Sequence, residues 1–216
     1  MPGSRLPDQD FSELEASVLR LSSASHWDIP VLVGGSTVHL LASAPADPRT
    51  APGGADRHQD EVRFWADYIT GADYPVDDDG TSGGLAPGSD FVVLGSLGTD
   101  PRAAGGEGTG AISGLLDLPQ VQDTRPTSRG ALLARDRQHT AVVPGEGGER
   151  TTARADYVLP SASLATTGSG VFWPAAGQPG SSLVGQDPQA SGLAAQIGDS
   201  APTDHRLVWV DITPGH

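Results

Sequence analysis

The sequence predicts a layered α/β protein that folds as a single domain. Its 216 residues are enough for one ordinary hydrophobic core. Short β-rich runs alternate with a few amphipathic segments at helical spacing, and no internal repeat or linker divides the chain. Residues 1–9 are polar and are expected to form a disordered tail, so the predicted domain covers residues 10–216.

The first predicted element is a helix that starts at Asp10. Asp10 is a good N-cap, and Glu13 follows three residues later, as in a capping box. Four apolar residues at 3-4-3 spacing then define one helical face: Phe11, Leu14, Val18 and Leu21.

A β-hairpin and a second helix follow. The runs Ile29–Val33 and Thr37–Ala42 flank Gly34-Gly35, which is typical of a tight hairpin turn. Residues 44–58 are rich in proline and glycine and are expected to form a loop. The segment Asp60–Thr70 is expected to be a helix, because Val62, Trp65 and Ile69 recur on one face.

The rest of the chain is expected to be mostly strands. The segment Phe91–Gly95 has the continuous apolar character of a buried strand, and Ala111–Leu116 is expected to be a short helix. A long loop over residues 71–90 precedes them. Five further runs are predicted as strands: Leu132–Ala134, Ala141–Val143, Tyr157–Leu159, Val171–Trp173 and Leu207–Ile212.

Composition excludes several kinds of chemistry. The chain contains no Cys, Lys or Asn, which removes thiol nucleophiles, thiolate metal sites, Schiff-base lysines, the lysine of a phosphate-binding P-loop and N-glycosylation. Its formal net charge is −14, which disfavours binding to nucleic acid because such a surface repels polyanions. No apolar run approaches the length needed to span a membrane, and the first ten residues are not a cleavable signal.

Three apparent motifs do not predict a site. Residues 80–84 fit the G-x-S-x-G pattern of serine hydrolases, but an acidic loop precedes them where a nucleophile elbow needs a strand. The glycine-rich stretch 105–114 has Ser113 where a dinucleotide fingerprint needs its third glycine. The run Asp77–Asp79 lacks the ligand spacing of a calcium loop and is expected to be a solvated turn.

Five segments taken in order carry a family resemblance: RHQDEVRFWADYI (57–69), FVVLGSLGTDP (91–101), ADYVLPS (155–161), SGVFWP (169–174) and TDHRLVWVDI (203–212). They resemble the carboxyl-terminal half of the endonuclease/exonuclease/phosphatase superfamily, especially its actinobacterial-type members. The resemblance implies part of a four-layered α/β sandwich, in which two packed, mostly antiparallel sheets are flanked by helices. The amino-terminal half of that fold is expected to be absent.

The resemblance also implies a catalytic site for hydrolysis of phosphate esters. In this family a histidine contacts the phosphate or assists proton transfer, and a carboxylate orients it. His205 matches the histidine and Asp156 the orienting carboxylate, while Asp204 matches a carboxylate near the metal. The cofactor implied by the resemblance is Mg²⁺, which would polarise the phosphoryl oxygens.

Three positions depart from the family pattern. The Asp-x-Asn that follows the FVVLG strand is replaced by Ser96-Leu97-Gly98, and Ala44 stands where relatives carry a histidine. The resemblance places Ser96, Gly98 and Ala44 in the substrate pocket. Because loss of one preorganised polar group commonly costs about 10²–10³ in rate, the isolated chain is expected to be an impaired or inactive phosphoesterase.

Two other functions remain open: a pseudoenzyme that serves as a binding or scaffold module, and an acid–base catalyst in which His205 and Asp156 act on a non-phosphate substrate. The expected partner is a second polypeptide that supplies the missing half, or a second copy of the chain. The reason is that Trp65, Trp173 and Trp209 lie on elements that this half would cover. Either secretion or a cytoplasmic location is compatible with the sequence.

Overall fold

The computed structural model describes residues 1–2, 4, 12–48, 54–103, 109–145, 149–185 and 203–213. These residues form two compact units. The first unit consists of Met1–Gln122 and Leu159–Leu164, and the second of Asp123–Val158 and Ala165–Thr213. The single domain over residues 10–216 stays a prediction, and the tail predicted for residues 1–9 lies mostly outside the described residues.

The first helix begins later than the sequence predicted. Helix α1 covers Glu13–Val18, and its N-cap is Ser12 rather than Asp10, which lies outside the described residues. The Ser12 hydroxyl accepts the backbone N–H of Glu15, and the Glu15 carboxylate accepts the backbone N–H of Ser12. This reciprocal pair satisfies two donors at the helix start and fixes the boundary there.

The predicted hairpin is confirmed. Strand β1 covers His26–Val33 and strand β2 covers Ser36–Ser43, and they pair antiparallel from His26↔Ser43 to Val33↔Ser36. The two turn residues, Gly34 and Gly35, both have positive φ, as a two-residue hairpin turn requires.

The second helix is longer than the sequence predicted. Helix α2 covers Gly54–Ile69, so the loop expected over residues 44–58 is wrong for its last five residues. The expected apolar face of Val62, Trp65 and Ile69 is buried. The earlier start has a tertiary cause, because His58 is also buried and its polar side chain finds partners elsewhere in the fold.

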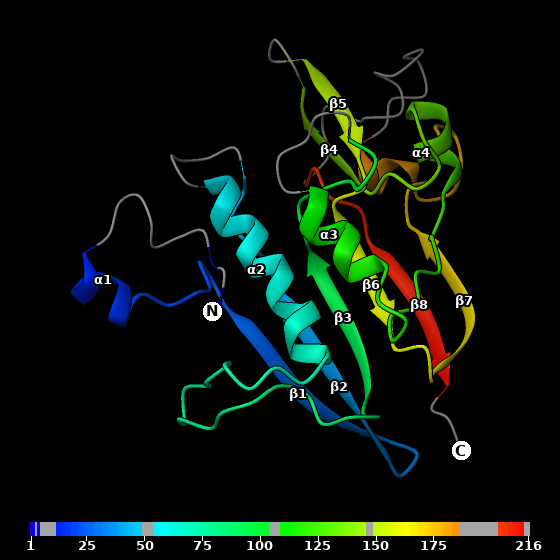
Figure 1. Cartoon of the computed structure of the whole chain (residues 1–216). Coiled ribbons are helices and arrows are strands. Elements are labelled where there is room, and N and C mark those ends of the chain that lie inside the picture. Colours follow the sequence, from blue (N-terminus) through cyan, green and yellow to red (C-terminus); the bar gives the residue numbers. More distant parts are fainter. Residues whose placement is uncertain are drawn as a thin grey trace. The chain divides into compact units, whose positions relative to one another are not determined.

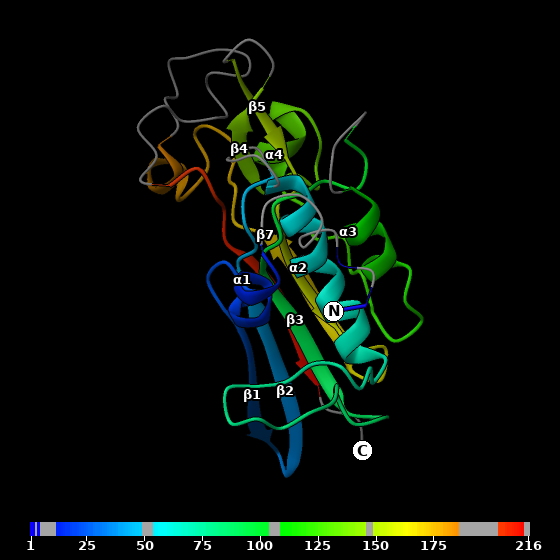
Figure 2. The ribbon, with the colours of Figure 1, turned by 60° about the vertical axis from the view of Figure 1, so that its left-hand side comes forward.

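Strands β1, β2 and β3 organise the first unit, and they belong to a four-stranded sheet in the order β1-β2-β3-β6. Strand β3, Asp90–Ser96, runs parallel to β2, and β6 covers Asp156–Pro160. Helices α2 and α3, Thr109–Leu116, lie side by side in front of β2 and β3 in Figure 1, and Figure 2 shows the same helices turned. Both the buried strand at 91–95 and the helix at 111–116 are confirmed.

The two faces of the hairpin have different surroundings. Residues paired across strands point to the same face, so Asp28, Leu41 and Val93 share one face. That face contacts α2, because the Tyr68 hydroxyl donates to Asp28 and the Trp65 indole N–H donates to Ser43. On the opposite face, Trp27, Ile29 and Val33 of β1 are 57%, 41% and 40% exposed.

One predicted strand of the second unit is a helix. Helix α4 covers Arg129–Ala134, where the sequence predicted a strand over Leu132–Ala134. The Ser128 hydroxyl caps it by accepting the Ala131 N–H at 3.1 Å. Gly130 allows the helix to approach closely, because a Cβ there would lie 2.5 Å from the Trp173 side chain. The Ser128 cap and the close packing at Gly130 therefore favour a helix here instead of the predicted strand.

Two antiparallel strand pairs complete the second unit. Strands β4, Ala141–Pro144, and β5, Arg150–Ala153, pair antiparallel, as do β7, Ala165–Val171, and β8, Val208–Thr213. The sequence missed β5, and it placed the strand at 171–173 too late. A short 3₁₀ helix, η3, covers Ser181–Val184. The core of this unit consists of Ala131, Val142, Val171, Trp173 and Val184.

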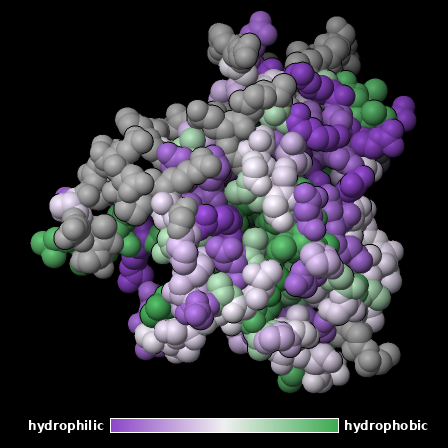
Figure 3. Space-filling view, in the orientation of Figure 1, coloured by the Kyte–Doolittle hydropathy of each residue, from purple (hydrophilic) through white to green (hydrophobic). Residues whose placement is uncertain are grey.

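The tryptophans correct one sequence-based expectation. Trp65 and Trp173 are fully buried, and only Trp209 of the three is exposed. The first two therefore do not mark an uncovered surface. On the face drawn in Figure 3, hydrophilic and near-neutral residues predominate, with smaller groups of hydrophobic residues between them. Among the described residues, every helix is too short or too polar to cross a membrane.

The contact between the ends of β2 and β3 yields a stability prediction. A Cβ on Gly95 would lie 2.0 Å from the Ser43 carbonyl oxygen, and φ at Gly95 is +145°. We expect Gly95→Ala to lower the free energy of unfolding by at least about 3 kcal/mol, because backbone must move. The control Gly34→Ala also has positive φ but meets no atom within 4 Å, and should cost only about 1 kcal/mol. Urea unfolding of both variants measures the difference; equal losses would contradict it.

Candidate functional site

The second unit brings Asp156 and His205 together, as the resemblance implied. His205 Nδ1 lies 2.8 Å from Asp156 Oδ1 and 3.0 Å from Oδ2. The carboxylate is mostly buried, with 15% of its side chain exposed, whereas 48% of the imidazole is exposed. An ionised carboxylate only accepts hydrogen bonds, so Nδ1 carries the proton and Nε2 is the nitrogen left to exchange protons.

Thr140 fixes the position of Asp156. Its hydroxyl donates to Asp156 Oδ2 at 2.8 Å. The Thr140 hydroxyl oxygen in turn accepts the backbone N–H groups of Ala155 and Asp156 at 3.0 and 2.9 Å. Thr140 is itself buried, so the carboxylate is attached to a well-packed part of the unit rather than to a flexible surface group.

Thr140 also helps to position His205. The Thr140 carbonyl accepts the backbone N–H of Arg206 at 2.8 Å, and the Asp204 carbonyl accepts that of Val142 at 2.9 Å. An isolated bridge pairs Ala141 with His205. The segment that carries the histidine therefore runs antiparallel to β4, and one threonine anchors both members of the pair.

The surrounding charges favour the protonated imidazole. The hydrogen bond to Asp156 raises the pKa of His205 above its ordinary value, and the charges of Asp156 and Asp204 add to the rise. Partial burial and the charge of Arg206 oppose it. Asp204 forms an ion pair with Arg150. Arg206 is buried, and its guanidinium lies 4.6 Å from the centre of the Trp173 ring.

The residues of this site do not fit a magnesium ion. Mg²⁺ needs several oxygen ligands with carboxylates among them. Asp204, the residue expected near the metal, is engaged by Arg150, while Asp156 is engaged by His205 and Thr140. Within the described ranges, no group of three His, Cys, Asp or Glu side chains could hold a metal ion.

The three predicted substrate-pocket residues belong to the first unit. Ser96 is the last residue of β3, and Ala44 directly follows β2 and is exposed. Gly98 is also exposed, with φ of +73°. Because Ala42 pairs with Leu94 in parallel register, Ala44 and Ser96 lie at neighbouring strand ends. Their roles stay predictions.

Sequence reasoning missed the residue that joins these strand ends. His58 of α2 is fully buried. Its Nδ1–H donates to the Ala46 carbonyl at 2.8 Å, and its Nε2 lies 2.6 Å from the Thr99 hydroxyl oxygen, which donates to it when the imidazole is neutral. Burial lowers the pKa of His58, in agreement with this arrangement. A Cβ on Gly98 would lie 3.1 Å from His58 Cε1.

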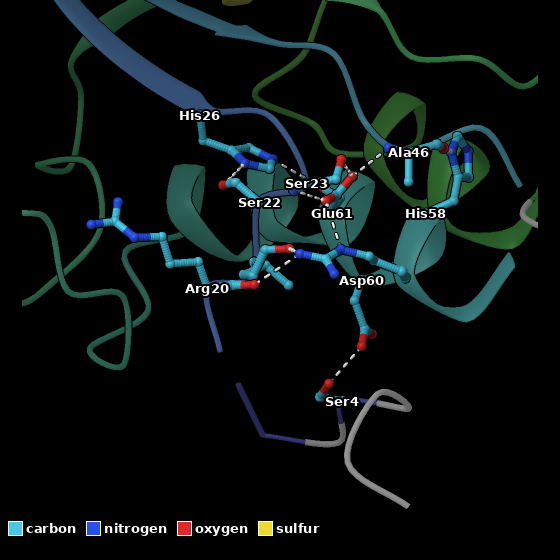
Figure 4. Close-up of polar contacts among 11 residues, drawn as sticks. Ser4, Arg20, Ser22, Ser23, His26, Ala46, His58, Asp60 and Glu61 are labelled. Atoms are coloured by element: carbon cyan, nitrogen blue, oxygen red, sulfur yellow. Dashed lines mark hydrogen bonds and ion pairs between the residues drawn. The ribbon is translucent and has the colours of Figure 1, made fainter. Parts of the chain in front are cut away.

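A buried carboxylate next to His58 binds the preceding loops (Figure 4). Glu61 is fully buried and accepts the Ser23 and Ala46 backbone N–H groups, the second at 2.6 Å. The Ser23 hydroxyl donates to it at 3.1 Å, and Arg57 Nε lies 3.3 Å away. The acidic and basic residues at 57–61 were a visible signal for this cluster, since charged side chains are seldom buried without partners.

Comparison with known proteins gives a fold but no close relative. Neither a family model nor a curated protein matches the chain. Among solved structures, it is similar to an endonuclease/exonuclease/phosphatase from Beutenbergia cavernae, with 15% identity and a TM-score of 0.50 over 87% of this chain and 39% of that one. An endonuclease/exonuclease/phosphatase family protein from Leptotrichia buccalis has 12% identity and a TM-score of 0.41, over 86% of this chain and 52% of that one. A beta toxin from Staphylococcus aureus has 12% identity and a TM-score of 0.43, over 86% of this chain and 55% of that one.

The chain therefore has the endonuclease/exonuclease/phosphatase fold, as its motifs suggested. It spans about 39–55% of the length of these three solved structures.

The pair predicts a measurable titration. In Asp156→Asn the imidazole loses the carboxylate, so we expect the pKa of His205 to fall toward its ordinary value of about 6.5. The folded-state pKa of the wild type lies above the unfolded value, so the stabilisation from this pair is present below about pH 6.5 and is lost as pH rises through the folded pKa. NMR titration of the imidazole, with Thr140→Ser as the control that keeps the hydroxyl, measures the shift. An unchanged titration in Asp156→Asn would contradict the pairing.

Proposed function

We propose that the chain is a divergent phosphoesterase-like protein whose acid–base pair is intact and whose hydrolytic activity as an isolated chain is impaired. The observation that carries this proposal is the His205–Asp156 hydrogen bond, anchored by Thr140. The fold supports it, because the solved structure with the same fold is described as an endonuclease/exonuclease/phosphatase. The protein's net charge of −14 favours a small phosphate ester over a polyanion.

The pair supplies two kinds of chemistry. When protonated, His205 Nε2–H donates a hydrogen bond to a phosphoryl oxygen or passes its proton to the leaving oxygen. When neutral, Nε2 accepts a proton from an attacking water. Asp156 stabilises the charged imidazolium in both cases and keeps the ring in one orientation.

The impairment follows from the poor fit of this site to a divalent metal ion. A divalent ion would supply the charge that stabilises the developing oxyanion in this kind of hydrolysis, and the carboxylates beside His205 are already paired. By the resemblance, Ser96 and Gly98 replace an Asp and an Asn that position water and phosphate. Their loss removes charge and hydrogen-bonding groups that an active phosphoesterase needs.

Hydrolysis of bis(p-nitrophenyl) phosphate tests this function, together with binding of inorganic phosphate followed by ³¹P NMR. We expect phosphate to bind more tightly at about pH 6 than at about pH 8, because protonated His205 attracts it. His205→Ala should weaken the binding by at least about tenfold. We expect added Mg²⁺ to leave hydrolysis near the uncatalysed rate.

His39→Ala is the matched control. His39 also pairs with a carboxylate, since its Nδ1 lies 2.7 Å from Asp28 Oδ1, but it belongs to the first unit. Its removal should leave phosphate binding unchanged.

Rapid Mg²⁺-dependent turnover that His205→Ala abolishes would contradict the impairment. Metal-independent turnover of a non-phosphate ester, lost in the same variant, would favour the repurposed acid–base catalyst. Phosphate binding unaffected by His205→Ala would leave a scaffold module as the better proposal.

The exposed face of β1 supports a partner for this chain. Trp27, Ile29 and Val33 alternate along the strand and therefore form one apolar row on one face. Such a row on an edge strand is a typical association surface. We propose that this row is covered by a second polypeptide and, when none is present, by a second copy of the chain.

Light scattering tests the self-association. We expect the wild type to exceed its monomer mass of 22.1 kDa at high concentration, and Trp27→Ser/Ile29→Ser to return it to a monomer. Leu133→Ser, which alters an exposed leucine of α4, should have no effect. A wild type that stays monomeric at about 100 µM, in the range where weak contacts form, would contradict the second-copy proposal.

A further inference from the structure

The first unit contains a pocket at the amino-terminal end of β3. Its cavity is about 280 Å³, which is the size of a small ligand with one ring. Ser96, the predicted phosphate-site residue, is at the other end of the same strand, six residues or roughly 20 Å away. The pocket is therefore at the opposite end of β3 from Ser96, and the proposal for it does not rest on the function proposed above.

The walls of the pocket are fixed by backbone hydrogen bonds. The Phe91 carbonyl accepts the Ser161 N–H at 2.7 Å, and the Gln120 carbonyl accepts the Ala162 N–H at 2.8 Å. Another part of the lining is a turn from Ala86 to Ser89, closed by a 3.1 Å hydrogen bond, with positive φ at Gly88. A pocket held in this way is largely formed before a ligand arrives.

The floor is apolar. Ile69, Leu85 and Phe91 line the pocket, and each is otherwise buried in the core. These side chains would contact the ring or short hydrocarbon part of a ligand. Burial of that part is the favourable contribution of this surface.

Two of the three hydroxyl groups in the pocket lining, those of Ser161 and Ser163, form a hydrogen-bonded chain. The Ser163 hydroxyl donates to Asp90 Oδ1 at 2.5 Å, so its only proton is used. The Ser161 oxygen lies 2.9 Å from that of Ser163 and must donate to it, while it accepts the Phe91 N–H at 3.2 Å. Both hydroxyl protons thus point toward Asp90, and the remaining lone pairs of the two oxygens are acceptors.

The charge next to the pocket is negative. Asp90 lies outside the lining but ends the hydroxyl chain, and none of the lining residues is charged. The whole chain is strongly acidic as well. A carboxylate or phosphate would meet repulsion and acceptor oxygens here, whereas an ammonium group would meet attraction and has only donors to offer.

We propose that this pocket binds a small organic ammonium ion, with its apolar part on Ile69, Leu85 and Phe91 and its N–H groups directed at Ser161 and Ser163. The acceptor chain selects the ammonium head, and the apolar floor selects a body of about one ring. No covalent step is involved.

Benzylammonium, benzyl alcohol and benzoate test the proposal, because they share one ring and differ in the head group. In NMR titrations of the full chain, we expect saturable shifts for benzylammonium at the backbone amides of Leu85, Phe91 and Ser161. Binding of benzyl alcohol should be at least about fivefold weaker, and benzoate should not bind, since both lack the charge that Asp90 attracts.

Asp90→Asn removes the charge with little change of shape, and we expect it to weaken benzylammonium binding by at least about fivefold. Asp73→Asn is the matched control, because it changes the net charge equally at an exposed residue that is not part of the hydroxyl chain. If Asp90→Asn does not fold, Ser163→Ala serves as the second variant. It changes an exposed position, breaks the hydroxyl chain and should also weaken benzylammonium binding. Equal binding of all three probes, or shifts located elsewhere, would overturn the proposal.

Discussion

The buried polar side of helix α2 is the constraint on which the first unit depends. Glu61 and His58 are fully buried, and each has hydrogen-bond partners in segments distant along the chain. Glu61 binds the chain at Ser23 and Ala46, and His58 binds the chain at Ala46 and Thr99. Because an unpaired buried carboxylate is very costly, the helix is stable in this place only when those loops are in theirs. The buried polar side chains of α2 thereby fix the loops that follow β2 and β3.

The second unit uses the same principle on a smaller scale. Thr140 has one hydroxyl and one carbonyl, and they position the two members of the candidate pair separately. The hydroxyl holds Asp156, and the carbonyl holds the backbone beside His205. A change at Thr140 therefore affects the imidazole of His205 indirectly, through Asp156 and through the backbone beside the histidine. Polar groups in this protein act in networks, so single residues do not have independent effects.

The pocket at the amino-terminal end of β3 and the pair at Asp156 differ in what they offer a ligand. At His205 a proton is available and its presence depends on pH, so the site suits an anion. Near Asp90 the hydroxyl protons of Ser161 and Ser163 are directed toward that carboxylate, so that site suits a donor. One acidic chain thus presents surfaces of opposite preference, because local hydrogen-bond direction outweighs net charge.

Sequence alone determined the elements with strong local signals. The glycine pair at 34–35 specified the hairpin, the continuous apolar run at 91–95 specified a buried strand, and the motifs around Asp156 and His205 specified a pair 49 residues apart in the chain. Only the tertiary structure decided the start of α2, the helix at Arg129–Ala134 and the buried role of His58. Each of these depends on a partner from a distant segment: Ala46 and Thr99 for His58, and Trp173 for Gly130. Periodicity and composition describe neighbours along the chain, and they contain no information about which distant group will satisfy a polar side chain or admit a close backbone approach.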